Sequence, residues 1–397
     1  MIESRRAGQV RQTALSLAAE QIGGRVVILT GSTAGSRQIA RFVADAGATP
    51  REIPLADLPT ETRSRFAAME SALHHPTGEV VDRIDGADPT GSGLVYAGSF
   101  TAVSTLAGRK VIGARTPAVL AVERKDIQQS LLDLPGRIVP IDDFQPAGPA
   151  MVVQGIPADG VAMATSHTYL MPPHSEAHPR QDTVLATLRR DCRQLRIAPF
   201  HPGIPCTFYG FVTGSDVIDF GPVEALVFWD PQTWRLVAPG IVRPLPLQNA
   251  DAVNARIQVH DVATRLRERA GYVGAFGVDG VLTTDGYVIH EINPRVCAGF
   301  SLLNRLAPDD APLSAVDLTL RESPEAATQA LTAPLSRLAA EVSRDQTPTY
   351  RLWDDPAPLG DDELRRMDRR QLAAFLTESA GVGRIALRTL QDHASWR

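Results

Sequence analysis

Apolar and polar residues alternate with different periods in different parts of this chain. Residues 25–36 (RVVILTGSTAGS) form a continuous apolar run that ends in small turn residues, and residues 37–47 follow with apolar positions at helical spacing. This pattern predicts a buried strand, a turn and a helix. Short apolar runs recur at 94–96 and 111–112 between helix-like stretches. We therefore expect residues up to about 115 to form an open α/β domain.

The middle of the chain is expected to contain helices and a β-rich region. Helical spacing covers residues 121–133 and 183–195, whereas residues 150–154, 196–200 and 207–229 have the patterns of strands. The β-rich region is punctuated by glycines, which is typical of several short strands joined by turns.

A long helix and a hairpin precede the C-terminal part. Asp251 can cap a helix that runs to Ala270, with Gly271 as its stop. An alternating pattern typical of a hairpin follows directly. Proline interrupts the segments beyond residue 310, and a late amphipathic helix is predicted to open at Asp361.

Composition narrows the classes of function. The chain has 397 residues, 44% of them hydrophobic and 21% charged, which is the profile of a globular protein with two or three packed units. The net charge is -5 and no long run of one sign occurs, so we expect neither nucleic acid nor a membrane as partner. The three widely spaced cysteines support no disulfide framework. Without a signal peptide or membrane-spanning segment in the pattern, a cytoplasmic location is expected.

The most informative stretch is residues 275–295 (AFGVDGVLTTDGYVIHEINPR), in which two alternating segments flank a turn. We treat residues 284–286 as a three-residue loop with Gly286 in the left-handed conformation. Residue 283 then pairs with residue 287, which fixes the register of the whole hairpin.

This register brings three oxygen-bearing side chains together. Asp279 lies opposite Glu291, and Asn293 is two residues further along the same face. Two carboxylates across a sheet repel each other unless a cation lies between them. Magnesium prefers such hard oxygen ligands and shares them with phosphates, so these residues predict a metal–triphosphate site. The opposite face is expected to face the core and carries Phe276, Val278, Leu282, Val288, His290 and Ile292.

Arg295 and the loop after it are candidates for binding the substrate. The planar guanidinium of Arg295 can donate hydrogen bonds to a phosphoryl oxygen or to an acyl phosphate. The loop of residues 296–301 (VCAGFS) enters a predicted helix whose free N–H groups could hold a carboxylate, with Gly299 permitting close approach and Ser301 next to it.

These residues resemble the closing motif of the ATP-grasp superfamily, in which an Asp on one strand and a Glu-x-Asn on the next hold magnesium beneath ATP. The resemblance is most specific in residues 291–295. It implies an α/β and α+β architecture: an ATP-grasp domain at 116–310 with a lid at about 146–205, after a Rossmann-like pre-ATP-grasp domain at 1–115 and before a C-terminal extension at 311–397.

The resemblance also implies how ATP is held. In the superfamily two lysines and a glycine-rich lid grip the phosphates, and Lys125 resembles the first lysine. Gln154 stands where many members have the second lysine, and the loop from Gly155 to Gly160 is poor in glycine. The hinge that reads adenine is expected to comprise Arg196, Ala198, Pro199 and Phe200.

The implied activity is that of an ADP-forming ligase. Magnesium-bound ATP would convert a carboxylate into an acyl phosphate, which an amine or peptide then attacks, with Lys125 and Arg295 as catalytic residues. The whole chain is reminiscent of pheganomycin-type peptide ligases and of the butirosin-type ligase that loads glutamate onto a carrier protein. The acceptor could also be the thiol of a carrier protein, and the protein could form a homodimer. Because Gln154 supplies no charge, a catalytically silent nucleotide-binding or partner module is the alternative.

Three other groups of residues have structural explanations. The turn at 31–36 invites dinucleotide binding, but it lacks the G-x-G-x-x-G pattern, and we interpret it as a structural turn. His174, Glu176 and His178 follow two prolines and lack the spacing of a helical zinc motif, so we interpret them as solvated. We interpret Cys297 as a small packing residue rather than a reactive thiol.

Overall fold

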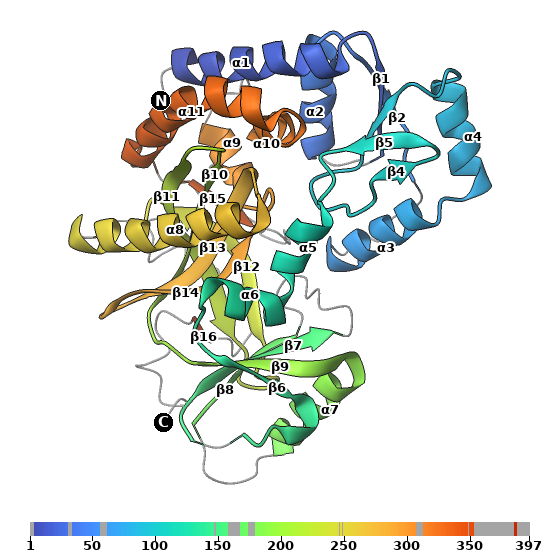
Figure 1. Ribbon diagram of the computed structural model, residues 1–397. Coiled ribbons are helices and arrows are strands. Elements are labelled where there is room, and N and C mark those ends of the chain that lie inside the picture. Colours follow the sequence, from blue (N-terminus) through green and yellow to red (C-terminus); the bar gives the residue numbers. More distant parts are fainter. Residues whose placement is uncertain are drawn as a thin grey trace, which may run out of the picture.

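The computed structural model of the chain has an upper and a lower lobe joined by a central antiparallel sheet (Figure 1). The structure describes residues 4–30, 34–55, 62–146, 148–157, 167–173, 179–245, 247, 249–306, 313–347, 349–352 and 385–386. The turn around residue 32, the histidines at 174 and 178, and the helix expected from Asp361 lie wholly or partly outside these ranges.

The N-terminal domain is an α/β unit, as the apolar runs predict. Its sheet has the order β2-β1-β3-β5-β4, and all neighbouring pairs are parallel except β4 with β5. Helices cover both faces, which is why β1 and β3 are almost continuously apolar. The elements are α1 Ser4–Ile22, β1 Val26–Leu29, α2 Ala34–Asp45, β2 Thr49–Glu52, α3 Thr62–His74, α4 Gly78–Ala87, β3 Leu94–Tyr96, β4 Thr105–Leu106 and β5 Arg109–Ile112.

Two short helices lead from this domain to the central sheet, where one helix was predicted over 121–133. They are α5 Pro117–Glu123 and α6 Lys125–Leu132. Arg124 adopts an extended conformation between them and binds the carboxylate of Asp126. The break makes Lys125 the first residue of a new helix.

The lower lobe is a four-stranded antiparallel sheet of order β6-β9-β7-β8, which we call the lid sheet. It comprises β6 Arg137–Pro140, β7 Met151–Pro157, β8 Thr168–Met171 and β9 Cys192–Pro199, with the short 3-10 helix η1 Ile141–Asp143 and α7 Pro179–Asp191. The helix predicted over 183–195 is therefore wrong at its end. Residues 192–195 pair with β7 instead, because Cys192 and Leu195 are buried in the lid core.

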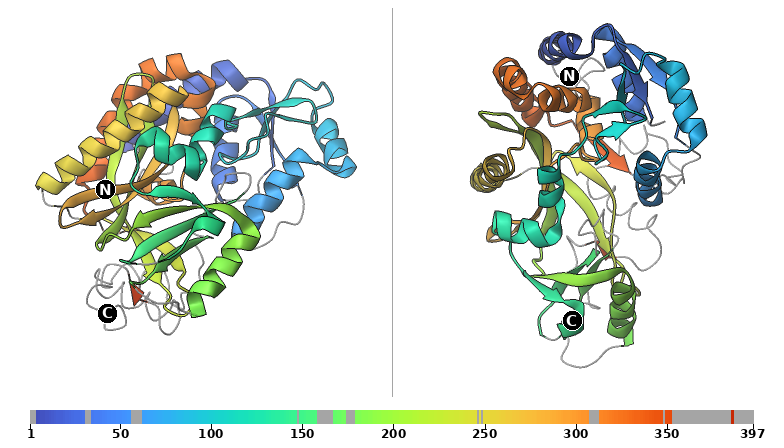
Figure 2. Two further views of the ribbon diagram at one scale, coloured as in Figure 1. Left: turned by 60° about the horizontal axis from the view of Figure 1, so that its bottom comes forward. Right: turned by 45° about the vertical axis from the view of Figure 1, so that its right-hand side comes forward.

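The central sheet has the order β14-β13-β10-β11-β12-β15, with β16 also paired to β11. α8 crosses one face of it and packs on β14, as Figure 2 shows from two further sides. Its strands are β10 Ile204–Val212, β11 Val217–Trp229, β12 Leu236–Arg243, β13 Gly274–Thr283, β14 Gly286–Asn293, β15 Thr349–Leu352 and β16 Ile385–Ala386. α8 spans Asn249–Ala270, so it begins two residues before the predicted cap and ends where predicted.

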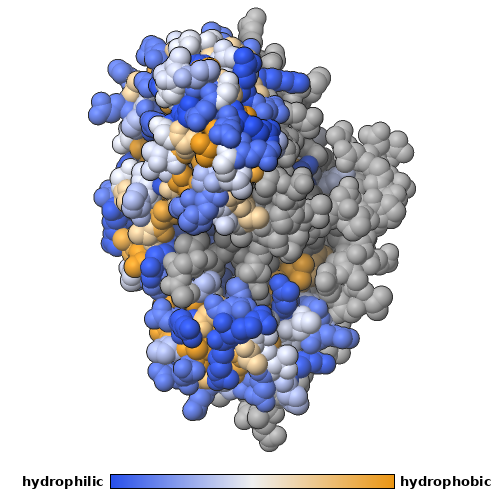
Figure 3. Space-filling model, turned by 90° about the vertical axis from the view of Figure 1, so that its right-hand side faces the viewer, coloured by the Kyte–Doolittle hydropathy of each residue, from blue (hydrophilic) through white to orange (hydrophobic). Residues whose placement is uncertain are grey.

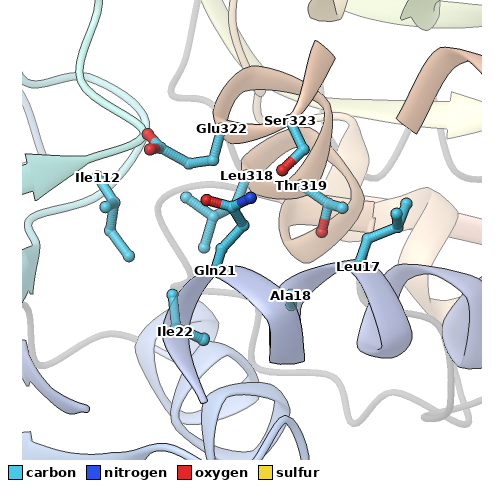
Figure 4. A pocket seen from close by; sticks show the side chains of 9 residues that line it. All are labelled: Leu17, Ala18, Gln21, Ile22, Ile112, Leu318, Thr319, Glu322 and Ser323. Carbon is cyan, nitrogen blue, oxygen red and sulfur yellow. The ribbon is translucent and has the colours of Figure 1, made fainter. Parts of the chain in front are cut away.

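Three later helices return to the N-terminal domain: α9 Phe300–Leu306, α10 Leu313–Glu322 and α11 Pro324–Arg344. They share one hydrophobic core with α1 and α2. The cavity between α1, β5 and α10 measures only about 20 Å³, room for about one water molecule, so it holds no substrate (Figure 4). The domain boundaries at 115 and 310 stay a prediction.

Within the described ranges, no helix is long and apolar enough to cross a membrane. On the face drawn in Figure 3, the coloured residues of both lobes are mainly hydrophilic, with small separate hydrophobic areas. Scattered apolar residues of this kind are normal on a protein surface.

Candidate active site

The hairpin β13–β14 brings Asp279 directly opposite Glu291, but by a different route from the predicted one. Its loop has two residues, because Thr283 pairs with Gly286. The register then shifts between Asp279 and Gly280, where a β-bulge adds one residue to β14. The predicted three-residue loop is therefore wrong, and the bulge restores the expected pairing beyond it.

The bulge also changes which residues face the core. Tyr287, Ile289 and Ile292 pack beneath α8, whereas Val288 does not join that cluster. His290 is the unpaired residue of the bulge and is only half-buried, with its ring centroid 6.3 Å from that of His201, so it does not lie in the core as predicted. The adjacent polar residues His290 and Glu291, between Ile289 and Ile292, interrupt the alternation of YVIHEIN at the bulge.

Neutral donors hold the Asp279 carboxylate in place. The hydroxyl of Thr207 on the neighbouring strand β10 donates to Oδ1 at 2.6 Å, and Asn293 Nδ2 donates to Oδ2 at 2.8 Å. Thr207 is 4% exposed and was not a sequence candidate. These bonds fix the carboxylate without supplying a positive charge.

Lys125 supplies the positive charge nearest to Glu291. Its ammonium group forms an ion pair with the Glu291 carboxylate, and only 5% of the residue is exposed. One turn further along α6, Gln128 donates to the carbonyl of Ile292 at 2.6 Å and accepts from its N–H at 3.1 Å. These two bonds fasten α6, and with it Lys125, to the strand that carries Glu291.

The two facing carboxyl groups differ in acidity. Burial, and after it the charge of Glu291, raises the pKa of Asp279 to about 6. Burial acts in the same direction on Glu291, but Lys125 outweighs it, and the pKa of Glu291 falls to about 2. Both groups are ionised at neutral pH, and Lys125 matches only one of the two charges. The two carboxylates therefore suit a magnesium ion, for which the amide oxygen of Asn293 would be a third ligand.

Arg295 stands beside this pair in a charged network that reaches the N-terminal domain. Its Nη2 donates to Asn293 Oδ1 at 3.0 Å, and its Nε lies 3.3 Å from the Glu123 carboxylate. The guanidinium also lies over the Phe100 ring, 4.7 Å from the centroid. Glu123 forms a second ion pair with Arg115, which bonds to the carbonyl of Phe100. Sequence patterns did not indicate Glu123, Arg115 or Phe100, because they come from three separate segments.

Two predicted lid residues lie together on the lid sheet. Gln154 on β7 is paired with Arg196 on β9, and Arg196 Nη1 donates to Gln154 Oε1 at 2.9 Å. The charge of Glu291 acts on the pKa of Arg196, which places this pair on the side of the lid sheet that faces the hairpin.

Other predicted residues lie elsewhere. Gly155 belongs to strand β7, and a side chain there would collide with Cys192 and Leu188 of the lid core. Gly160 lies outside the described residues. Gly299 is covered by Tyr209, whose ring would be 2.1 Å from an added Cβ, and the Ser301 hydroxyl donates to a carbonyl of its own turn.

The expected hinge follows the lid sheet into β10. Ala198 and Pro199 close β9, with Ala198 paired to Val152. The N–H of Phe200 donates to the carbonyl of Ala150 at 3.1 Å, so this N–H is already engaged.

The sequence matches no protein-family model and no curated protein. Solved structures do resemble the fold. N5-carboxyaminoimidazole synthetase from Staphylococcus aureus, complexed with ADP, is similar over 84% of this chain and 94% of its own, at 9% identity and a TM-score of 0.50. Pyruvate carboxylase from Rhizobium etli is similar over 74% of this chain and 28% of its own, at 13% identity and a TM-score of 0.51. L-amino acid ligase from Bacillus licheniformis covers 78% of this chain and 76% of its own, at 13% identity and a TM-score of 0.49.

At such identities a likeness shows the fold and leaves the substrate open. The fold assignment rests on the first two structures, whose TM-scores are 0.50 and 0.51. The chain therefore has the ATP-grasp fold, preceded by a Rossmann-like domain.

Proposed function

We propose that this protein is an ATP-dependent ligase that joins a carboxylate to an amine through an acyl phosphate and releases ADP. The observation that carries the proposal is the facing pair Asp279 and Glu291, with Lys125 on one side and Arg295 on the other. Two carboxylates and two cations around one cleft suit a substrate that is both anionic and metal-bound.

Asp279, Glu291 and Asn293 would hold magnesium. When bound, the ion supplies positive charge that neutralises the phosphates of ATP and the leaving ADP. The neutral donors to Asp279 favour this role, because they orient the carboxylate and leave its charge for the metal.

Lys125 would hold an oxygen of the triphosphate. Its ammonium group has three donors, so it can bind a phosphate oxygen and still contact Glu291. The helix start and the Gln128 bonds position it before ATP arrives, which reduces the reorganisation needed at the reaction step.

Arg295 would bind the carboxylate substrate and the acyl phosphate formed from it. Glu123 and Phe100 fix the plane of its guanidinium, and Nη2 is directed to Asn293. A planar fork held in this way can present two parallel donors to a carboxylate or phosphate.

The proposed chemistry has two steps. A carboxylate oxygen of the first substrate forms a bond to the γ-phosphorus as the bond from that phosphorus to ADP breaks. An amine nitrogen then attacks the acyl carbon, inorganic phosphate leaves, and the nitrogen loses a proton. Catalysis rests on alignment and on matching the charge that develops on phosphate.

The test supplies purified protein with magnesium, ATP and pooled amino acids and short peptides whose carboxylates carry ¹⁸O. Product masses identify the bond formed, and transfer of one ¹⁸O atom into phosphate reports the acyl phosphate. Glu291→Gln is expected to lower ADP release by about 100-fold or more. Asp285→Asn, at the exposed tip of the same hairpin, is the matched control. Equal rates for both variants would rule out the role of Glu291.

Gln154 favours a second candidate, a nucleotide-binding module without ligase activity, because it offers the phosphates no charge. Tight binding of Mg-ATP with no ADP release from any pool would support this candidate. A carrier-protein thiol as acceptor belongs to the same proposal and would appear as an acylated carrier in the mass spectra.

A further inference from the structure

The lid sheet contains a buried guanidinium in an unusual situation. Arg196 is 2% exposed, and no other charged residue in the described part of the lid sheet is buried. Its Nη1 donates to Gln154 and its Nη2 donates to the carbonyl of Pro135 at 3.1 Å. The third donor position, Nε, is buried and has no hydrogen-bond partner among the described residues.

Both partners of Arg196 are neutral acceptors, and no ion pair to a carboxylate is formed within the described ranges. A buried cation without an anion is costly, because burial removes its hydration and neutral acceptors return only part of it. An N–H left without an acceptor adds to the cost. An anion that bound beside Arg196 would offset this cost.

The opposite wall of the cleft offers a second unpartnered polar group. His290, the extra residue of the β14 bulge, has a buried Nε2 without a hydrogen-bond partner in the described part of the chain. An imidazole nitrogen can accept or donate one hydrogen bond.

The charges around the cleft indicate which anion fits. Lys125 and Arg295 lie on the hairpin side, whereas residue 154 brings no charge to the lid side. Arg196 on β9 is paired with residue 154 on β7. Its guanidinium therefore lies beside the neutral Gln154 side chain and supplies a positive charge there. An extended polyanion between the two walls would then meet cations on both sides.

We propose that Arg196 binds the phosphates of ATP and supplies the positive charge that Gln154 does not provide. Gln154 acts as the positioning residue, because its Oε1 holds Nη1 and turns the guanidinium toward the cleft. This inference rests on the proposed function, since it assumes that the cleft binds ATP.

The test compares affinities for ATP, ADP, AMP and adenosine by calorimetry with magnesium present and no ligase substrate. Arg196→Met is expected to weaken ATP binding about 10- to 100-fold and to leave adenosine within about twofold, so the loss grows with the number of phosphates. Arg193→Met on the same strand is the matched control, because Arg193 is exposed. Arg196→Lys, which keeps the charge but lacks Nε, is expected to show a smaller loss of the same kind.

A charge placed on the neighbouring strand provides the decisive comparison. Gln154→Lys combined with Arg196→Met is expected to recover at least about tenfold of the lost ATP affinity. Losses equal for ATP and adenosine, or no recovery in the double variant, would mean that Arg196 has only a structural role. If Arg196→Met does not fold, the dependence on phosphate number in Arg196→Lys decides between the same two outcomes. Failure of the unaltered protein to bind Mg-ATP would overturn the proposed function together with this inference.

Discussion

Two partly buried aspartates in the central sheet illustrate the difference between a carboxylate that serves stability and one that we propose binds a metal ion. Asp219 on β11 meets α8, where His260 Nε2 lies 2.8 Å away and Arg256 Nε lies 3.1 Å away. The N–H of Gly221 adds a third bond. Among the described residues, Asp279 on β13 has only a hydroxyl and an amide as hydrogen-bond partners, and a second carboxylate faces it.

The same burial leads to opposite acidities. Burial would raise the pKa of Asp219, but the hydrogen bond from His260 and the charge of Arg256 outweigh it, and the pKa is lowered. For Asp279 burial and Glu291 act together, and the pKa rises to about 6. Groups of the protein itself therefore stabilise the negative charge of Asp219, whereas the negative charge of Asp279 would be neutralised by a metal ion.

The largest expected difference is in activity. Asp279→Asn should reduce ADP formation by about 100-fold or more, because it removes charge from the proposed metal site. Asp219→Asn, assayed well below its melting temperature, should stay within about threefold of the unaltered protein. Steady-state ADP release measures both, and similar losses in the two variants would contradict the distinction.

The next difference is in stability, and it has opposite signs. Without magnesium at pH 8, Asp279→Asn should raise the free energy of unfolding, because it removes a buried charge that is unfavourable in the empty protein. Asp219→Asn should lower it by about 1 kcal/mol or more, because Arg256 and His260 lose a carboxylate acceptor. Urea unfolding followed by circular dichroism distinguishes these outcomes; destabilisation by both substitutions would refute the account of Asp279.

The pH dependence sharpens the same contrast. The pKa of Asp279 is higher in the folded protein than in the unfolded chain, so the folded state holds more protons between about pH 4 and 6. Stability without magnesium should therefore fall through this window as pH rises, and Asp279→Asn should lack this component. The stabilisation by magnesium should increase over the same window, because protons compete with the metal. Melting temperatures at pH 5 and 7, with and without magnesium, check both statements.

The smallest effect is expected at the edge of the Asp219 cluster. The His260 side chain is 43% exposed, so its contact with Asp219 is screened by solvent. His260→Ala should lower the free energy of unfolding by less than about 1 kcal/mol, since Arg256 and the Gly221 N–H still bind the carboxylate. A larger loss in urea unfolding would mean that His260 is the main partner of Asp219.

The sequence predicts those parts of the site that are encoded by nearby residues. Asp279, Glu291 and Asn293 belong to one hairpin, so alternation and a turn place them on one face. Lys125 was identified by the resemblance of its sequence context to a family motif, whereas the start of a new helix at Lys125 was missed, because one helix was predicted over 121–133. The two-residue loop and the bulge at His290 were missed because they offset each other, so the predicted register still pairs Asp279 with Glu291.

Contacts between distant segments were not predictable in this way. Thr207 and Asp279 form a hydrogen bond although 72 positions separate them in the sequence. Gln128 and Ile292 do so with a separation of 164 positions. The end of α7 at Asp191 is likewise decided by pairing with β7, not by local helix propensity. Helix and strand patterns indicate which face of an element is buried. Which residues of distant segments contact one another depends on the complete topology.

The two hydrogen bonds between the Gln128 side chain and the backbone of Ile292 also affect self-association. Among the described strands, β14 is the outer strand of the central sheet, and an outer strand exposes backbone groups that can recruit another chain. At Ile292 the Gln128 amide occupies both the N–H and the carbonyl, as the backbone of an added strand would. A glutamine side chain thereby blocks edge-to-edge pairing of strands next to the proposed nucleotide site.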